Sequence, residues 1–89
     1  FELTVIMTVT VGRGKLLETQ RDIAKLPYVC AVYDVTGQVD SIVIAKFRNR
    51  RELSEFPKDL LAMEYVERTN THVVLNTIKE DFRMVDNLR

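Results

Sequence analysis

The order in which its hydrophobic periodicities follow one another constrains this chain more than any other sequence feature. An alternation of period two gives way to a helical period, then to two adjacent strand-like runs, a second helical stretch and a last strand-like run. Period two is typical of a strand with two different faces, and apolar residues three and four apart mark one face of a helix. We expect strands over 1–11, 28–36, 39–47 and 65–79, and helices over 15–26 and 50–63.

The first and third strands indicate how the sheet is covered. Phe1 to Val11 alternates strictly, and Ile6 is the large apolar residue on the face that otherwise carries Glu2 and threonines. Gly12 and Gly14 then predict a turn. The run Ile42 to Ala45 is apolar on both faces, which predicts a central strand that is covered from two sides.

Each predicted helix has a recognisable boundary. Pro27 ends the first helix, because proline cannot donate to the helical hydrogen-bond ladder. Asn49 caps the second, with Glu52 placed to reach back to the cap. Pro57 lies inside that second helix and is expected to kink or split it. The apolar stripes are expected to consist of Leu16, Leu17, Ile23 and Ala24 in the first helix, and of Leu53, Phe56, Leu60 and Met63 in the second.

The order β-α-β-β-α-β predicts an α+β fold of the ferredoxin-like type. Two split βαβ units with right-handed crossovers form a four-stranded antiparallel sheet and place both helices on one face. The other face then exposes apolar side chains, Ile6 among them, that need a second cover. We expect that cover to be a second copy of the chain, which makes the protein a homodimer at least.

Composition excludes several classes of protein. Eighty-nine residues are too few for two independent cores, so we expect a single domain over 1–89. Thirteen basic and thirteen acidic residues cancel, whereas domains that bind duplex DNA by themselves usually carry a basic excess. Cys30 is the one cysteine, so no internal disulfide can form; we expect a cytoplasmic protein with this thiol buried in its strand. One cysteine and one histidine also exclude the usual zinc cages, and we expect no cofactor.

No residue pattern predicts catalysis. His72 is the only histidine, has no marked partner, and is expected at the surface or at an interface. Gly12 and Gly14 lack the third glycine of a dinucleotide-binding fingerprint. The basic run Arg48 to Arg51 is expected to be a solvated loop. The chain is therefore predicted not to be an enzyme.

The connection between the two middle strands is the informative place. Gly37 and Gln38 predict a two-residue turn in which glycine adopts a positive φ. Free backbone N–H groups of such a turn can hold a carboxylate, and Asp40 can pair with an ammonium group. Thr69 and Thr71 share one face of the last strand and add hydroxyl groups. These features suit the two charged ends of an amino acid, although turns and strands favour the same residue types without any ligand.

Two stretches resemble the Lrp/AsnC family of feast/famine transcription regulators. The stretch 32–40, VYDVTGQVD, resembles that family's hairpin. The stretch 68–75, RTNTHVVL, followed by KEDF at 79–82, resembles its last strand and tail, particularly in archaeal members. The resemblance covers Phe1 to about Arg83 and concerns only the C-terminal effector and assembly domain.

The resemblance implies a function as well as a fold. In that family this domain dimerises through its sheet, the dimers assemble into octamers or rings, and amino acids bind between dimers near the hairpin. It also implies that DNA is bound only through a helix-turn-helix domain, which these residues do not include. Because the chain opens on Phe1 and lacks an initiator methionine, we expect a piece of a longer regulator. By motif match, the expected ligand-binding residues are Gly37, Gln38, Val39, Asp40, Thr69 and Thr71.

Two other functions remain open from the sequence. A dimeric α/β-barrel enzyme has the same strand order and would need a polar cavity inside each monomer, for which His72, Tyr33 and Asp34 are the candidates. A pure oligomerisation module would have the same fold and bind no ligand.

Overall fold

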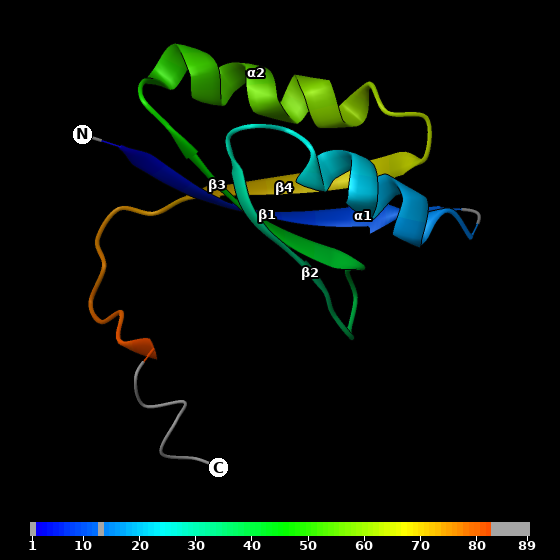
Figure 1. Ribbon diagram of the computed structural model, residues 1–89, viewed down its shortest axis with the longest axis horizontal. Coiled ribbons are helices and arrows are strands. Elements are labelled where there is room, and N and C mark those ends of the chain that lie inside the picture. Colours follow the sequence, from blue (N-terminus) through cyan, green and yellow to red (C-terminus); the bar gives the residue numbers. More distant parts are fainter. Residues whose placement is uncertain (1, 13, 83–89) are drawn as a thin grey trace.

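The computed structural model describes residues 2–12 and 14–82. Phe1, Arg13 and residues 83–89, which belong to the expected first strand, glycine turn and tail, lie outside the described residues. The predicted order of elements is confirmed (Figure 1). The elements are β1 (Leu3–Val11), α1 (Leu16–Ala24), β2 (Val29–Asp34), β3 (Ser41–Phe47), α2 (Arg50–Leu61) and β4 (Val66–Val73).

The four strands form one antiparallel sheet in the order β2-β3-β1-β4, so β1 and β3 are central. Both helices lie on the same face of this sheet (Figure 1). The ferredoxin-like fold expected from the sequence is therefore confirmed, together with the central position of β3.

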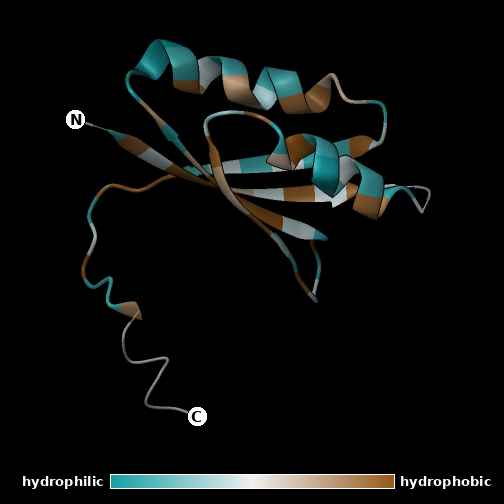
Figure 2. Ribbon diagram, viewed as in Figure 1, coloured by the Kyte–Doolittle hydropathy of each residue, from teal (hydrophilic) through white to brown (hydrophobic). Residues whose placement is uncertain are grey.

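The helix-covered face of the sheet holds the core. Three consecutive pairs of β1 and β3 on this face have no exposed surface: Val5 with Ala45, Met7 with Val43, and Val9 with Ser41. Ile23 of α1 and Phe56 and Leu60 of α2 close over them. Figure 2 shows the hydrophobic residues of α2 on the side that faces the sheet, as an amphipathic helix requires.

The helix-free face carries large apolar side chains without a cover. Ile6 of β1 lies opposite Ile44 of β3, and both are half-buried. Ile42 lies two residues before Ile44 on β3 and faces the same side. Tyr33 of β2 lies opposite Ile42, and 52% of the Tyr33 surface is exposed. His72 of β4 lies opposite Ile6 and is exposed, as expected.

The expected apolar stripe of α1 is only partly correct. Ile23 is buried, but Leu17 is 57% exposed and Ala24 is exposed. The polar residues Thr19 and Gln20 are buried instead. They tolerate burial because both have hydrogen-bond partners: the Thr19 hydroxyl donates to the Lys15 carbonyl at 2.8 Å, and the Gln20 amide donates to the Ser41 hydroxyl at 2.6 Å.

Of the kink or split expected in α2 at Pro57, the split does not occur, because a single helix runs through the proline. Proline removes one backbone hydrogen bond, and burial of the neighbouring Phe56 and of Leu60 offsets that loss. The cap is as predicted: the Asn49 side chain accepts from the Glu52 N–H at 3.0 Å. The Glu52 carboxylate accepts from the backbone N–H of Arg48 at 3.1 Å, one residue before the cap.

The connection between β2 and β3 is longer than the two-residue turn that the sequence predicts. Asp34 and Ser41 form the last strand pair, so residues 35–40 make up the connection. At the end of the connection, the Asp40 carbonyl accepts from the Val35 N–H at 3.1 Å, and the Asp40 N–H donates to the Val9 carbonyl of β1 at 3.0 Å. The connection is thereby attached to β1.

Two expectations about the outer strands are also corrected. The last strand ends at Val73 and not at residue 79, because β1 begins at Leu3 and Val74 donates to the Thr4 carbonyl near that end. Cys30 is exposed and not buried. The pairing of β2 with β3 shifts register between Val29 and Ala31, and this irregularity takes Cys30 out of the regular alternation.

Candidate functional site

The connection 35–40 has an open, exposed tip. Gly37 has φ +116°, so the predicted positive φ is confirmed. A side chain at Gly37 would meet no neighbouring atom, so the backbone conformation alone favours glycine there. Gln38 is exposed and Val39 is half-buried. The tip is thus accessible to a ligand or to another subunit.

Asp40 joins this connection to the end of β1. One carboxylate oxygen accepts a hydrogen bond from the backbone N–H of Val11 at 2.8 Å, beside the bond from the Asp40 N–H to the Val9 carbonyl. Because β3 begins only at Ser41, the Val11 N–H would otherwise lack a partner on that side. Asp40 therefore has a structural role, while its second carboxylate oxygen has no hydrogen bond within the described residues.

The two threonines lie on the other side of β1. Thr69 lies opposite Val9 and Thr71 opposite Met7, which places both on the helix-covered face. Thr69 is half-buried and Thr71 is exposed. The structure brings Thr69 to the same level of the sheet as Asp40, with β1 between them at roughly 10 Å, or two strand spacings. Thr71 is about 7 Å further along β4.

The six residues line none of the three best-formed clefts of the described residues. Three clefts of ≈ 410 to ≈ 430 Å³ are found in the described part of the chain, and all three are lined by other residues. No group of three or more metal-binding side chains occurs among residues 2–12 and 14–82. No helix in the same ranges is long and apolar enough to span a membrane.

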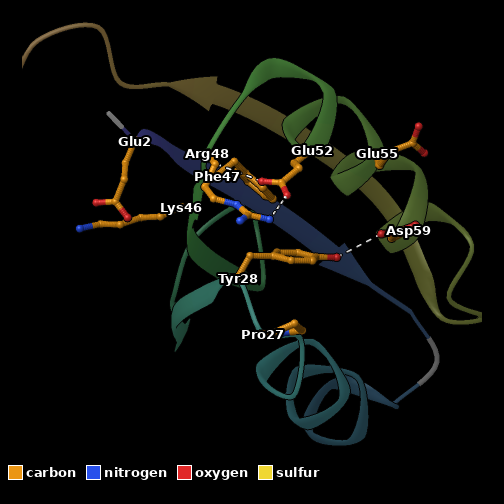
Figure 3. Close-up of a pocket in the computed structure, with 9 residues that line it drawn as sticks. All are labelled: Glu2, Pro27, Tyr28, Lys46, Phe47, Arg48, Glu52, Glu55 and Asp59. Atoms are coloured by element: carbon orange, nitrogen blue, oxygen red, sulfur yellow. Dashed lines mark hydrogen bonds and ion pairs between the residues drawn. The ribbon is translucent and has the colours of Figure 1, made fainter.

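One of these clefts is not predicted by any sequence pattern. It has a volume of ≈ 430 Å³ and lies between Tyr28, the end of β3 and α2 (Figure 3). The Tyr28 hydroxyl donates to the carboxylate of Asp59 at 3.1 Å. Burial, with smaller contributions from the hydrogen bond and the charge of Asp59, raises the pKa of Tyr28 to about 12. Tyr28 and Asp59 are 31 residues apart, and no periodicity signals their contact.

An ion pair forms part of the same cleft. The Arg48 guanidinium donates a hydrogen bond to the Glu52 carboxylate at 3.0 Å and forms an ion pair through this one contact. This hydrogen bond lowers the pKa of Glu52 and raises that of Arg48. Both groups are exposed to solvent, so the pair contributes little to the stability of the fold.

Comparison with known proteins identifies the family. A sequence model described as the Lrp/AsnC ligand binding domain matches residues 4–84. The chain belongs to the Lrp/AsnC family. A related HTH-type transcriptional regulator of Pyrococcus abyssi, named as uncharacterised, is 51% identical over 84 residues, which are 94% of this chain and 57% of the relative. The chain thus spans little more than half the length of this relative.

Solved structures of AsnC and of another transcriptional regulator have the same fold. E. coli AsnC matches with a TM-score of 0.82 over 89% of this chain and 54% of its own; at 14% identity this likeness concerns the fold alone. A transcriptional regulator of Neisseria meningitidis, solved as a complex with L-Met, matches with a TM-score of 0.77 and 27% identity over 90% of this chain and 54% of its own.

The family assignment confirms two expectations from the sequence. The resemblance to Lrp/AsnC regulators is correct, and the chain is a ligand-binding domain of transcription regulators. It is not an enzyme, since its family and its named relatives are regulators. The α/β-barrel enzyme is thereby set aside.

Proposed function

We propose that this Lrp/AsnC chain is the effector-binding and assembly domain of a cytoplasmic transcription regulator. It would associate with copies of itself and bind an amino acid at a subunit interface. DNA binding would belong to a helix-turn-helix part of the whole protein, and the 89 residues would act as one domain. The observation that carries the effector proposal is the exposed connection 35–40, which Asp40 attaches to the end of β1.

The proposed amino-acid site combines the tip of the connection with an acidic group. Backbone N–H groups near Gly37 and Gln38 would hold the ligand carboxylate, because the tip is exposed and its backbone turns with a positive φ. The free oxygen of Asp40 would accept from the ligand ammonium group. Thr69, on β4 across β1, would add a hydroxyl group from the same level of the sheet, and Val39 and Thr71 would contribute from the connection and from further along β4.

The site needs a second subunit to be enclosed. Gly37, Gln38 and Thr71 are exposed, so these six residues of a single chain would leave most of a ligand in water. A neighbouring subunit against the tip would supply the missing wall. The L-Met complex of the Neisseria regulator supports an amino acid as the class of ligand.

Assembly is supported by the helix-free face. Ile6, Ile42 and Ile44 form an apolar row that the single chain leaves half-buried. Burial of this row against a second copy would stabilise a dimer, since apolar contact area is the main favourable contribution to association. Dimers would assemble further into a ring or an octamer. A ligand held between subunits would shift this assembly by its different affinities for the assembled and separate states.

A screen of the twenty amino acids by thermal unfolding tests the effector proposal. A ligand at a hundred times its Kd adds about 2.7 kcal/mol of stability. For a domain of this size that corresponds to a rise in Tm of roughly 10 °C or more. We expect one or a few amino acids to produce such a rise, and calorimetry to give a saturable affinity. If none does while the chain still assembles, the domain is an oligomerisation module without an amino-acid effector.

A further inference from the structure

The cleft beside Tyr28 has a rigid aromatic wall. The Tyr28 ring lies 5.0 Å from the ring of Phe47 and 5.2 Å from that of Phe56, measured between centroids. Phe47 and Phe56 are buried, and the Tyr28 hydroxyl donates a hydrogen bond to Asp59 on α2. The ring is therefore fixed from both ends, so a ligand would meet a preformed apolar surface.

Acidic residues of α2 lie along the opposite side of this cleft, and the carboxylate of one of them, Glu55, points away from Tyr28 (Figure 3). Glu52, Glu55 and Asp59 are spaced three and four residues apart, which places them along one side of the helix. Arg48 neutralises Glu52. Neither Glu55 nor Asp59 takes part in an ion pair within residues 2–12 and 14–82.

Basic groups do not compensate this negative charge. Lys46 is the other basic residue of the cleft, and its side chain points away from Tyr28 (Figure 3). Asp59 accepts the Tyr28 hydroxyl with one carboxylate oxygen, and its other oxygen has no hydrogen bond among the described residues. A cation lying along the Tyr28 ring would have a carboxylate at its end and an aromatic surface along its length.

We propose that this cleft binds a small organic cation, an ammonium or guanidinium group on a short aliphatic chain, with Asp59 as its charge partner and the Tyr28 ring as its wall. The site is separate from the connection 35–40, because none of the cleft residues belongs to that segment. An anion is disfavoured, since Arg48 is already paired and the remaining carboxylates would repel it.

Calorimetry with probes of matched length tests this site. The 89-residue chain is titrated at low ionic strength, where charge interactions are least screened, with 1,4-diaminobutane, butylguanidine and the four-carbon dianion succinate. We expect saturable binding of at least one of the two cations and none of succinate. Absence of saturable binding of both cations at millimolar concentration would overturn the proposal, as would equal binding of succinate.

Three variants locate the site. Asp59→Asn keeps an acceptor for the Tyr28 hydroxyl and removes the charge, so the Kd of the cation should rise at least about tenfold. Asp22→Asn is the matched control, because it removes one exposed carboxylate of α1 that is ion-paired to Lys25; it should change the Kd by less than about twofold. Glu18→Gln, which removes the exposed carboxylate of α1 paired with Lys15, should likewise leave cation binding unchanged. Equal weakening by all three variants, or none by Asp59→Asn, would contradict a site at this cleft.

Discussion

The two faces of the sheet are built from the same two central strands but have different surroundings. On one face, Met7 and Val43 lie opposite each other under the helices and have no exposed surface. On the other, Ile6 and Ile44 lie opposite each other, with no helix over them, and remain half-buried. The first face stabilises the single chain. The second holds apolar surface that the single chain does not use, and we propose that it stabilises the assembly.

The largest expected effect comes from a charge placed on the helix-covered face. Val43→Asp would put a carboxylate among fully buried side chains that offer it no ion-pair partner. Burial of an unpaired charge places this change among the most destabilising substitutions, at about 4 kcal/mol or more. We expect the variant to be unfolded or to have a strongly reduced midpoint in urea, monitored by circular dichroism.

The neighbouring residue should respond differently. Ile44→Asp places the same charge on the helix-free face, where the side chain is half-buried and can reach water. We expect this variant to retain the circular dichroism spectrum of the parent and to lose self-association. If Ile44→Asp unfolded the chain as completely as Val43→Asp, the two faces would not have the separate roles described above.

A smaller effect is expected from a change that touches neither face. Asp40→Asn keeps an oxygen for the Val11 N–H and removes the charge proposed to bind the ligand ammonium group. Affinity for the amino acid found in the thermal screen should fall by about 1.5–3 kcal/mol, the range of a charge-assisted hydrogen bond. Unchanged affinity in calorimetry, with fold and assembly intact, would show that Asp40 only attaches the connection to β1.

The smallest expected effect is the contribution of Tyr28, at the edge of the helix-covered face, to the free energy of unfolding at high pH. The pKa of Tyr28 is raised from 10.0 to about 12, so the folded state keeps this hydroxyl protonated after the unfolded state has ionised. The resulting contribution to stability is present below pH 10.0 and is lost as the pH rises toward about 12. The free energy of unfolding should therefore fall over this interval, and Tyr28→Phe should reduce that fall. An identical pH dependence in both proteins would contradict the assigned environment of Tyr28.

Sequence patterns predict the fold well because the alternation of residues along a strand shows which side chains share a face. Ile6 and the run Ile42 to Ala45 are enough to place the uncovered face correctly from alternation alone. The errors arise where distant residues meet. Gln20 is buried with a hydrogen bond to Ser41, and Asp40, at the end of the connection 35–40, bonds to Val9 of β1.

The candidate site is less predictable than the fold. The positive φ of Gly37 follows from turn chemistry, and the hydrogen bond from Val11 to Asp40 does not, because it joins residues 29 apart. The cleft at Tyr28 depends on its contact with Asp59, which no periodicity signals. A ligand site shared between subunits also requires a surface that a single chain does not contain.

Sedimentation of the chain at micromolar concentration tests most directly whether the helix-free face is an interface. The single chain has a mass of 10.3 kDa. We predict a species of twice that mass or more for the parent, and a folded monomer for Ile44→Asp, because a standard protein interface should persist at this concentration. A parent chain that sediments only as a folded species of 10.3 kDa would contradict the proposed role of this face.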